Sequence, residues 1–218
     1  MEAFKYFKLD CRVTKSQVKV LIIFIAISLI FAVTNDSVNF AFAYLCFGSM
    51  MIFSAPFYMD VSNNGFYELL PGKSESKVLG RYLYLLALVL MTIFFGGIVL
   101  LLGKSSGKEI INVDVFSMFS VLCIALIFGS IQYILYYKLG KFKSNYANSL
   151  FRMIPALIVL VFGSAFSKII GDGSGVEKIV KYINDNLFFI SLLEIVLTMI
   201  IFVVCITIST SIYKNKDL

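Results

Sequence analysis

Long apolar runs and short polar segments alternate along the whole chain. Six runs approach or exceed the roughly 20 helical residues that a bilayer crossing takes. They are Val18–Val33, Phe40–Met59, Tyr82–Leu102, Val115–Tyr137, Leu150–Phe166 and Leu187–Ile212. The first and fifth runs are short, and we expect both to extend into flanking polar residues. The pattern predicts an all-α integral membrane protein with six transmembrane helices in a single transmembrane domain, residues 1–218.

The basic residues lie mostly beside the ends of these runs and indicate the orientation. Of the 19 Lys and Arg residues, 14 fall on one predicted side of the membrane, together with both termini, and five fall on the other. Because cytoplasmic loops carry the excess of Lys and Arg, we expect both termini in the cytoplasm, beneath a plasma membrane. Topology and anionic lipid therefore account for the net charge of +6, and nucleic-acid binding is not needed. The many Lys, Ile and Asn residues point to a bacterial source.

The N-terminal segment, residues 1–17, is predicted to be an amphipathic interfacial helix. Spacings of three and four place a row of basic residues on one face and a row of apolar residues one position earlier. The basic row is Lys5, Lys8, Arg12, Lys15 and Lys19, and the apolar row is Phe4, Phe7, Cys11 and Val18. Such a helix either anchors the protein at the lipid surface or contacts a partner.

The segment before the last apolar run, residues 168–186, is expected to be an extracellular amphipathic helix. Three glycines open it, and Ser174 followed by Glu177 fits a capping box. Apolar residues from Val176 to Leu187 then recur on one helical face. The segment either dips back into the membrane or covers the outer face of the helix bundle.

Two polar residues stand inside the predicted spans. Glu194 lies about two turns into the last span, where a carboxylate is costly, and Gln132 lies in the fourth. On one interpretation Glu194 faces a pathway or a subunit seam, where it meets a cationic group. On the other it is protonated or hydrogen-bonded to a nearby hydroxyl.

The composition argues against catalysis by this chain. It is 60% hydrophobic and 15% charged, so a soluble domain of its size could not bury its apolar side chains. The chain has no His, and its four cysteines are scattered without metal-ligand spacing. No paired carboxylates lie within the spans, which disfavours an intramembrane enzyme. We expect no metal and no cofactor in this chain.

The loop between the second and third spans, residues 60–81, combines unusual features. An aromatic and apolar patch is followed by the break Pro71-Gly72 and by a basic helix start from Lys73 to Arg81. The patch consists of Phe66, Tyr67, Leu69 and Leu70. This makeup is typical of a small helical elbow that lies at a membrane surface and contacts another molecule.

The layout and this loop resemble the permease subunits of type-2 ABC exporters. Those proteins commonly have a short helix ending in Leu-Pro after the second span, a basic stretch, and then Gly-Lys/Arg-Tyr-Leu at the start of the third. Here Leu70-Pro71 and Gly80-Arg81-Tyr82-Leu83 match. Where relatives often have Ser-Arg after the proline, this chain has Gly72-Lys73-Ser74. The resemblance covers the whole chain in layout, but in motif it covers only this loop and the start of the third span.

The resemblance implies a permease that pairs with a second copy or a paralogue. A separate ABC ATPase, which binds the ATP and magnesium, would dock on a cytoplasmic coupling helix, which we call the elbow, Asn63–Pro71. Its coupling residues would be Asn63, Phe66, Tyr67, Glu68, Leu69, Leu70 and Pro71.

The exported substrate is predicted to be an amphipathic or antimicrobial-type peptide. The aromatic interior, with 22 Phe and 12 Tyr residues, suits such a substrate. Lipid-linked compounds or drugs come second. A different class remains open as well: a non-transporting membrane protein for peptide immunity or assembly, which would have no need of the elbow.

Overall fold

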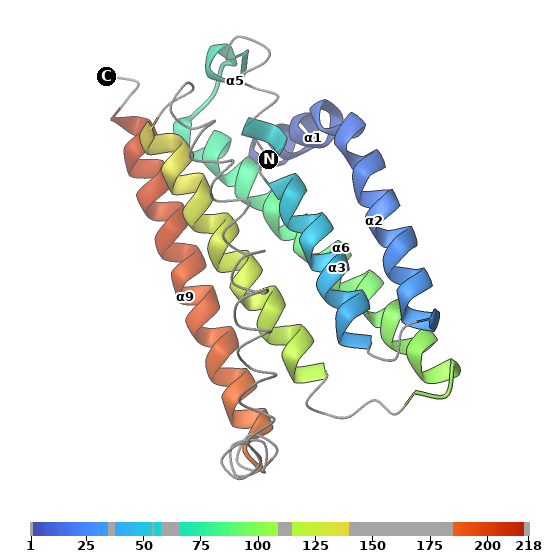
Figure 1. The fold of residues 1–218 in the computed structure, drawn as a ribbon. Helices are drawn as coiled ribbons and strands as arrows, with labels where there is room; N and C mark the ends of the chain where they lie inside the picture. Colours follow the sequence, from blue (N-terminus) through green and yellow to red (C-terminus); the bar gives the residue numbers. More distant parts are fainter. Residues whose placement is uncertain are drawn as a thin grey trace.

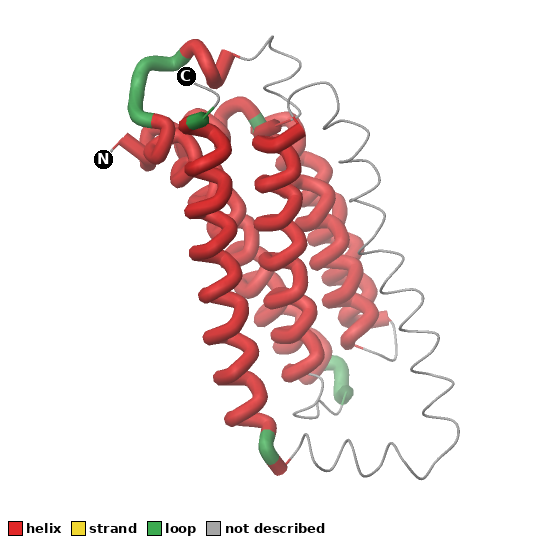
Figure 2. The backbone as a smooth tube through the Cα atoms, turned by 90° about the vertical axis from the view of Figure 1, so that its left-hand side faces the viewer, coloured by secondary structure: helices red, strands yellow, loops and turns green. Residues whose placement is uncertain are grey.

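The computed structural model describes residues 2–34, 38–53, 55–57, 66–108, 115–139 and 185–215, apart from the side chains of Phe66 and Glu68. Every regular element in these ranges is a helix, and the long helices lie side by side (Figures 1 and 2). They are α1 (Glu2–Val13), α2 (Lys15–Thr34), α3 (Val38–Phe53), α5 (Phe66–Leu69), α6 (Ser74–Ser105), an unlabelled helix Val115–Leu139, and α9 (Leu187–Lys214). Residues 55–57 are helical as well.

Five of these helices are long and apolar enough to cross a membrane: α2, α3 with its continuation to Phe57, α6, Val115–Leu139 and α9. The prediction of an all-α, multi-pass membrane protein is thereby confirmed. The helices extend past the predicted runs at their polar ends, because the backbone hydrogen bonds of a helix can continue beyond the hydrocarbon core of the bilayer. The predicted span Leu150–Phe166 and almost all of the predicted outer segment, residues 168–186, lie outside the described residues.

The Val115–Leu139 helix and α9 run in the same direction. Ser120 contacts Glu194 near the start of both helices, and the rings of Tyr137 and Tyr213 pack near their ends. The chain therefore leaves the Val115–Leu139 helix at one end of the bundle and enters α9 at the opposite end.

Helices α3 and α6 form the centre of the bundle. Small residues let their backbones approach closely. A Cβ atom added at Gly96 would lie 2.5 Å from the Phe42 ring, and the Ser49 and Thr92 hydroxyls are 2.6 Å apart. Tyr82 on α6 reaches α9, where its hydroxyl lies 2.9 Å from that of Ser209. Such contacts satisfy polar groups inside an apolar bundle, where water cannot.

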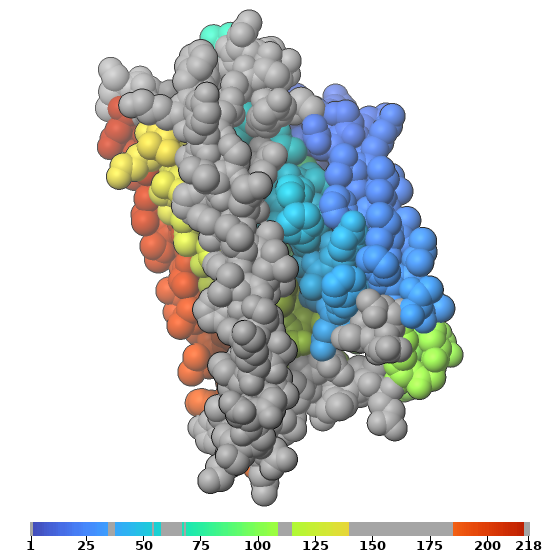
Figure 3. Space-filling view, in the orientation of Figure 1, coloured from blue at the N-terminus to red at the C-terminus, as the bar shows by residue number. Residues whose placement is uncertain are grey.

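Helices α2 and α9 lie at opposite edges of the molecule (Figure 3). Each buries few residues, and many of its exposed side chains are large and apolar. An apolar surface of this kind matches lipid or another transmembrane helix and would be unstable in water.

One end of the bundle gathers the elements outside the spans. The start of α1, all of α5 and the end of α9 lie there (Figure 1), and we call it the elbow end. Lys214 at the end of α9 pairs with Glu75 at the start of α6, with 2.6 Å between Nζ and Oε1. Helix α1 lies across this end, against α6, before the chain turns at Thr14 into α2.

Candidate functional site

The described part of the elbow is one helical turn followed by a sharp break. Helix α5 ends at Leu69, and α6 begins at Ser74. Between them Gly72 has a φ of 141°, which residues with a Cβ atom rarely adopt. Because Pro71 cannot continue a helix, the Pro-Gly pair ends α5 and lets the chain turn into α6. The predicted break is found where the sequence placed it.

The elbow presents an apolar surface to the outside. Leu69 is 80% exposed, the most exposed leucine among the large hydrophobic side chains of the described residues. Leu70 is half-buried and Pro71 is exposed. Asn63 and the side chains of Phe66 and Glu68 lie outside what the structure describes. Among the predicted coupling residues whose side chains the structure describes, Leu69, Leu70 and Pro71 are thus available for contact.

Tyr67 points the other way, into the protein, with 5% of its surface exposed. Its hydroxyl donates a hydrogen bond to the backbone carbonyl of Lys77, at 3.1 Å. The centroid of its ring lies 3.9 Å from Cζ of Arg81 and 5.6 Å from the ring centroid of Tyr6. Two residues apart in one turn of helix, Leu69 and Tyr67 therefore have opposite environments, one facing outward and one fixed to the bundle.

Arg81 is buried at the centre of this arrangement, although the sequence suggested only a charge at the border of a span. It is 1% exposed, and its Cζ lies over the rings of Phe57 at 4.3 Å and Tyr136 at 5.7 Å as well as over Tyr67. Aromatic faces stabilise a cation most strongly where water is excluded. Arg81 thus connects α5, α6, the continuation of α3 and the Val115–Leu139 helix.

Buried Asp10, from α1, lies in the same electrostatic neighbourhood. Burial raises the pKa of the Tyr67 hydroxyl, and the negative charge of Asp10 raises it further, while the charge and hydrogen bond of Arg81 lower it. A tyrosine hydroxyl is protonated at neutral pH in any case, and the raised pKa keeps it protonated, and donating to the Lys77 carbonyl, at more alkaline pH as well.

Helix α1 clamps the elbow from the outside of α6. The Tyr6 hydroxyl donates a hydrogen bond to the carbonyl of Pro71. A Cβ atom added at Gly80 would lie 2.5 Å from Cβ of Tyr6 and 2.9 Å from the carbonyl oxygen of Ala3. Glycine at position 80 of the family motif is therefore what lets α1 lie directly on α6.

Most of this contact comes from neither of the two rows predicted on α1, although Phe7 of the apolar row is half-buried and packs against the core. The basic row is exposed throughout, as are Phe4 and Cys11, whereas a third face carries the buried residues Tyr6, Asp10 and Thr14. The sequence offered one sign of this face, a spacing of four that places the three residues on one side of a helix. The basic row, Phe4 and Cys11 remain available to lipid or a partner.

The two polar residues inside the spans are not brought together. Glu194 accepts a hydrogen bond from the Ser120 hydroxyl at 2.9 Å, which is the second of the interpretations that the sequence left open. Gln132 is 7% exposed and lies on the same helix as Ser120. At 1.5 Å per residue, Gln132 is about 18 Å further along that helix. A pathway or seam role for either residue remains a prediction.

A comparison with models of protein families identifies the class of this protein. The chain belongs to the ABC-2 transporter family, because the family model described as ABC-2 family transporter protein matches residues 7–214. The protein is therefore the membrane-spanning permease subunit of an ABC transporter, and the resemblance to type-2 ABC exporters is confirmed. Membrane subunits of this family transport and are generally not catalytic. The comparisons with curated proteins and with solved structures gave no match.

Proposed function

We propose that this permease belongs to an exporter driven by a separate ABC ATPase, which docks on the elbow, Asn63–Pro71, from the cytoplasm. The ATPase would bind the ATP and magnesium, and the permease would pair with a second copy or a paralogue. The observation that carries the proposal is the exposure of Leu69 on a helical turn that Tyr67 fixes to the bundle. A large apolar side chain exposed outside the spans marks a site of interaction, and an apolar groove on a partner would cover it.

The contacts of Tyr67 with Lys77 and Arg81, which we call the Tyr67–Arg81 anchor, support this function because they connect the elbow mechanically to the spans. A push on α5 reaches α6 through two contacts of Tyr67, with the Lys77 carbonyl and with Arg81. From Arg81 it continues to the Val115–Leu139 helix through Tyr136. Packed side chains transmit displacement because they leave no free volume to absorb it. Closure of the ATPases would therefore shift the third and fourth spans together.

Substitution of Leu69 tests the docking. Fully burying a leucine stabilises a contact by about 1.5–3 kcal/mol, so four-fifths of that is about 1.2–2.4 kcal/mol. Leu69→Ala is expected to weaken binding of the partner ATPase by about 8- to 60-fold. Leu69→Asp, which would also bury a charge, is expected to abolish co-purification.

The matched control is Leu139→Ala, since Leu139 is also exposed at the elbow end but lies on another helix. This variant is expected to bind the ATPase normally. Unchanged affinity and unchanged ATPase stimulation in both Leu69 variants would refute docking at the elbow.

For the substrate, we propose an amphipathic peptide of the antimicrobial type. The 22 Phe and 12 Tyr residues support this choice, because rings offer an apolar surface that also interacts with cationic side chains. The test is ATP turnover by the permease–ATPase complex in proteoliposomes. A basic amphipathic peptide is expected to stimulate turnover, whereas stimulation only by an apolar drug or a lipid-linked compound would refute the assignment.

A further inference from the structure

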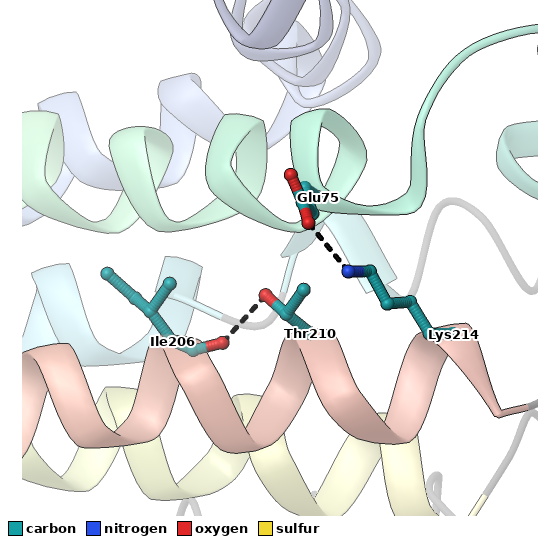
Figure 4. A network of polar contacts seen from close by, with 4 residues as sticks. All are labelled: Glu75, Ile206, Thr210 and Lys214. Atoms are coloured by element: carbon teal, nitrogen blue, oxygen red, sulfur yellow. Dashed lines mark hydrogen bonds and ion pairs between the residues drawn. The ribbon is translucent and has the colours of Figure 1, made fainter.

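A groove of about 410 Å³ lies between the start of α6 and the end of α9, at the elbow end. Its lining comes from both helices: Glu75, Leu79, Ile206, Thr207, Thr210, Ser211 and Lys214. Figure 4 shows Glu75 and Lys214 pointing toward each other across it, with Thr210 between the two helices. The groove is separate from the Tyr67–Arg81 anchor, and no step of the proposed coupling uses it.

The lining changes from charged to apolar along the helices. Helix α6 has 32 residues and α9 has 28. Both exceed the roughly 20 residues that cross the hydrocarbon core. Glu75 and Lys214 stand at the helix ends, where lipid headgroups lie, and Leu79 and Ile206 lie one to two turns deeper. Leu79 is exposed, and so is Leu83 one turn further along α6. The groove thus has a charged mouth and an apolar floor at the depths of a headgroup and an acyl chain.

Glu75 and Lys214, at the mouth of the groove, can give up their ion pair for charged groups of a ligand at little cost in stability. The Glu75–Lys214 pair is 2.6 Å long, but both side chains are more than half exposed, and ion pairs of that kind contribute little stability. Thr207 and Thr210 donate their hydroxyl hydrogens to carbonyls of their own helix, those of Val204 and Ile206. Both residues line the groove, and with their hydrogens so used their oxygens can still accept, which suits an ammonium group.

We propose that this groove binds a phospholipid with a zwitterionic headgroup. Its phosphate would pair with Lys214 and its ammonium with Glu75 and the threonine oxygens, while an acyl chain covers Leu79 and Leu83. A zwitterionic headgroup replaces one ion pair by two and leaves no charge unmatched. An anionic headgroup would satisfy Lys214 but leave Glu75 beside another negative charge.

The test is native mass spectrometry of the detergent-purified permease with two added lipids of equal chain length. Phosphatidylethanolamine is expected to remain bound at least fivefold more than phosphatidylglycerol. Glu75→Gln is expected to remove that preference, whereas Lys214→Ala is expected to lower the retention of both lipids, because both carry the phosphate. Lys104→Ala is the matched control, because Lys104 is a basic residue at the opposite end of α6, and it should leave the preference intact.

Several outcomes would overturn the proposal. Preferential retention of phosphatidylglycerol would show that Lys214 alone selects the ligand. Equal retention of phosphatidylethanolamine by the wild type and both groove variants would place the lipid elsewhere. Soluble glycerophosphoethanolamine, which has no acyl chains, should not compete at equal concentration, and competition by it would mean that the apolar floor contributes nothing. Thr210→Val tests the acceptor role separately, with a partial loss of the preference expected.

Discussion

Removal of the Tyr67 side chain should release the elbow from the bundle. In Tyr67→Ala the protein loses a desolvated cation–π contact with Arg81, and such a contact is worth about 2 kcal/mol. It also loses a ring contact with Tyr6 and a hydrogen bond to Lys77, and each of these is worth about 1 kcal/mol. The expected destabilisation is therefore about 4 kcal/mol, within the range of aromatic-to-alanine substitutions in cores. At about 2–4 °C per kcal/mol for a chain of this size, the midpoint of thermal unfolding should fall by about 8–16 °C.

The cysteines of the chain provide the assay. Cys46 and Cys205 are buried and free, so a thiol-reactive dye reports their exposure on unfolding, while exposed Cys11 is replaced by serine to remove its background. Tyr67→Phe keeps the ring and loses only the hydroxyl, so its midpoint should fall by about 2–4 °C. Leu69→Ala is the matched control and should change the midpoint by less than about 2 °C.

The unfolding midpoints of Tyr67→Ala and Leu69→Ala, compared with each other, decide whether Tyr67 anchors the elbow. If Tyr67→Ala unfolds at the same temperature as Leu69→Ala, Tyr67 does not anchor the elbow and the mechanical path through it is wrong. If the midpoint falls as expected, Tyr67→Ala should also bind the ATPase through its intact Leu69 but fail to couple ATP turnover to transport.

Two further predictions concern topology and the carboxylate in the last span. Single cysteines at Lys73 and Ser106, in a background without the native four, should react from opposite sides of intact cells, Lys73 only from the cytoplasm; labelling of both from outside would overturn the orientation. Glu194→Gln keeps an acceptor for Ser120 and removes the charge. If Glu194 serves a pathway or seam, stimulation of ATP turnover by a basic peptide should fall with little change in the unfolding midpoint. A higher midpoint with unchanged stimulation would instead show a polar residue that the span merely tolerates.

The sequence alone determined the features that depend on local chemistry. Apolar length identified the described spans, because a helix that crosses hydrocarbon must be apolar over a fixed distance. Pro71 and Gly72 located the break after the short helix, because proline cannot continue a helix and glycine accepts a positive φ. The Leu-Pro and Gly-Arg-Tyr-Leu motifs pointed to the family that the comparison then confirmed.

Only the tertiary structure decided which way each side chain faces. Tyr67 and Leu69 both belong to the aromatic and apolar patch on one helical turn, and the local sequence does not show that the ring is anchored and the leucine exposed. From the sequence, Arg81 is a charge at the border of a span. In the structure it is enclosed by Phe57 and Tyr136, which are distant along the chain. These outcomes depend on contacts between segments far apart in the sequence, and a helical period specifies the faces of a helix but not the neighbour that each face meets.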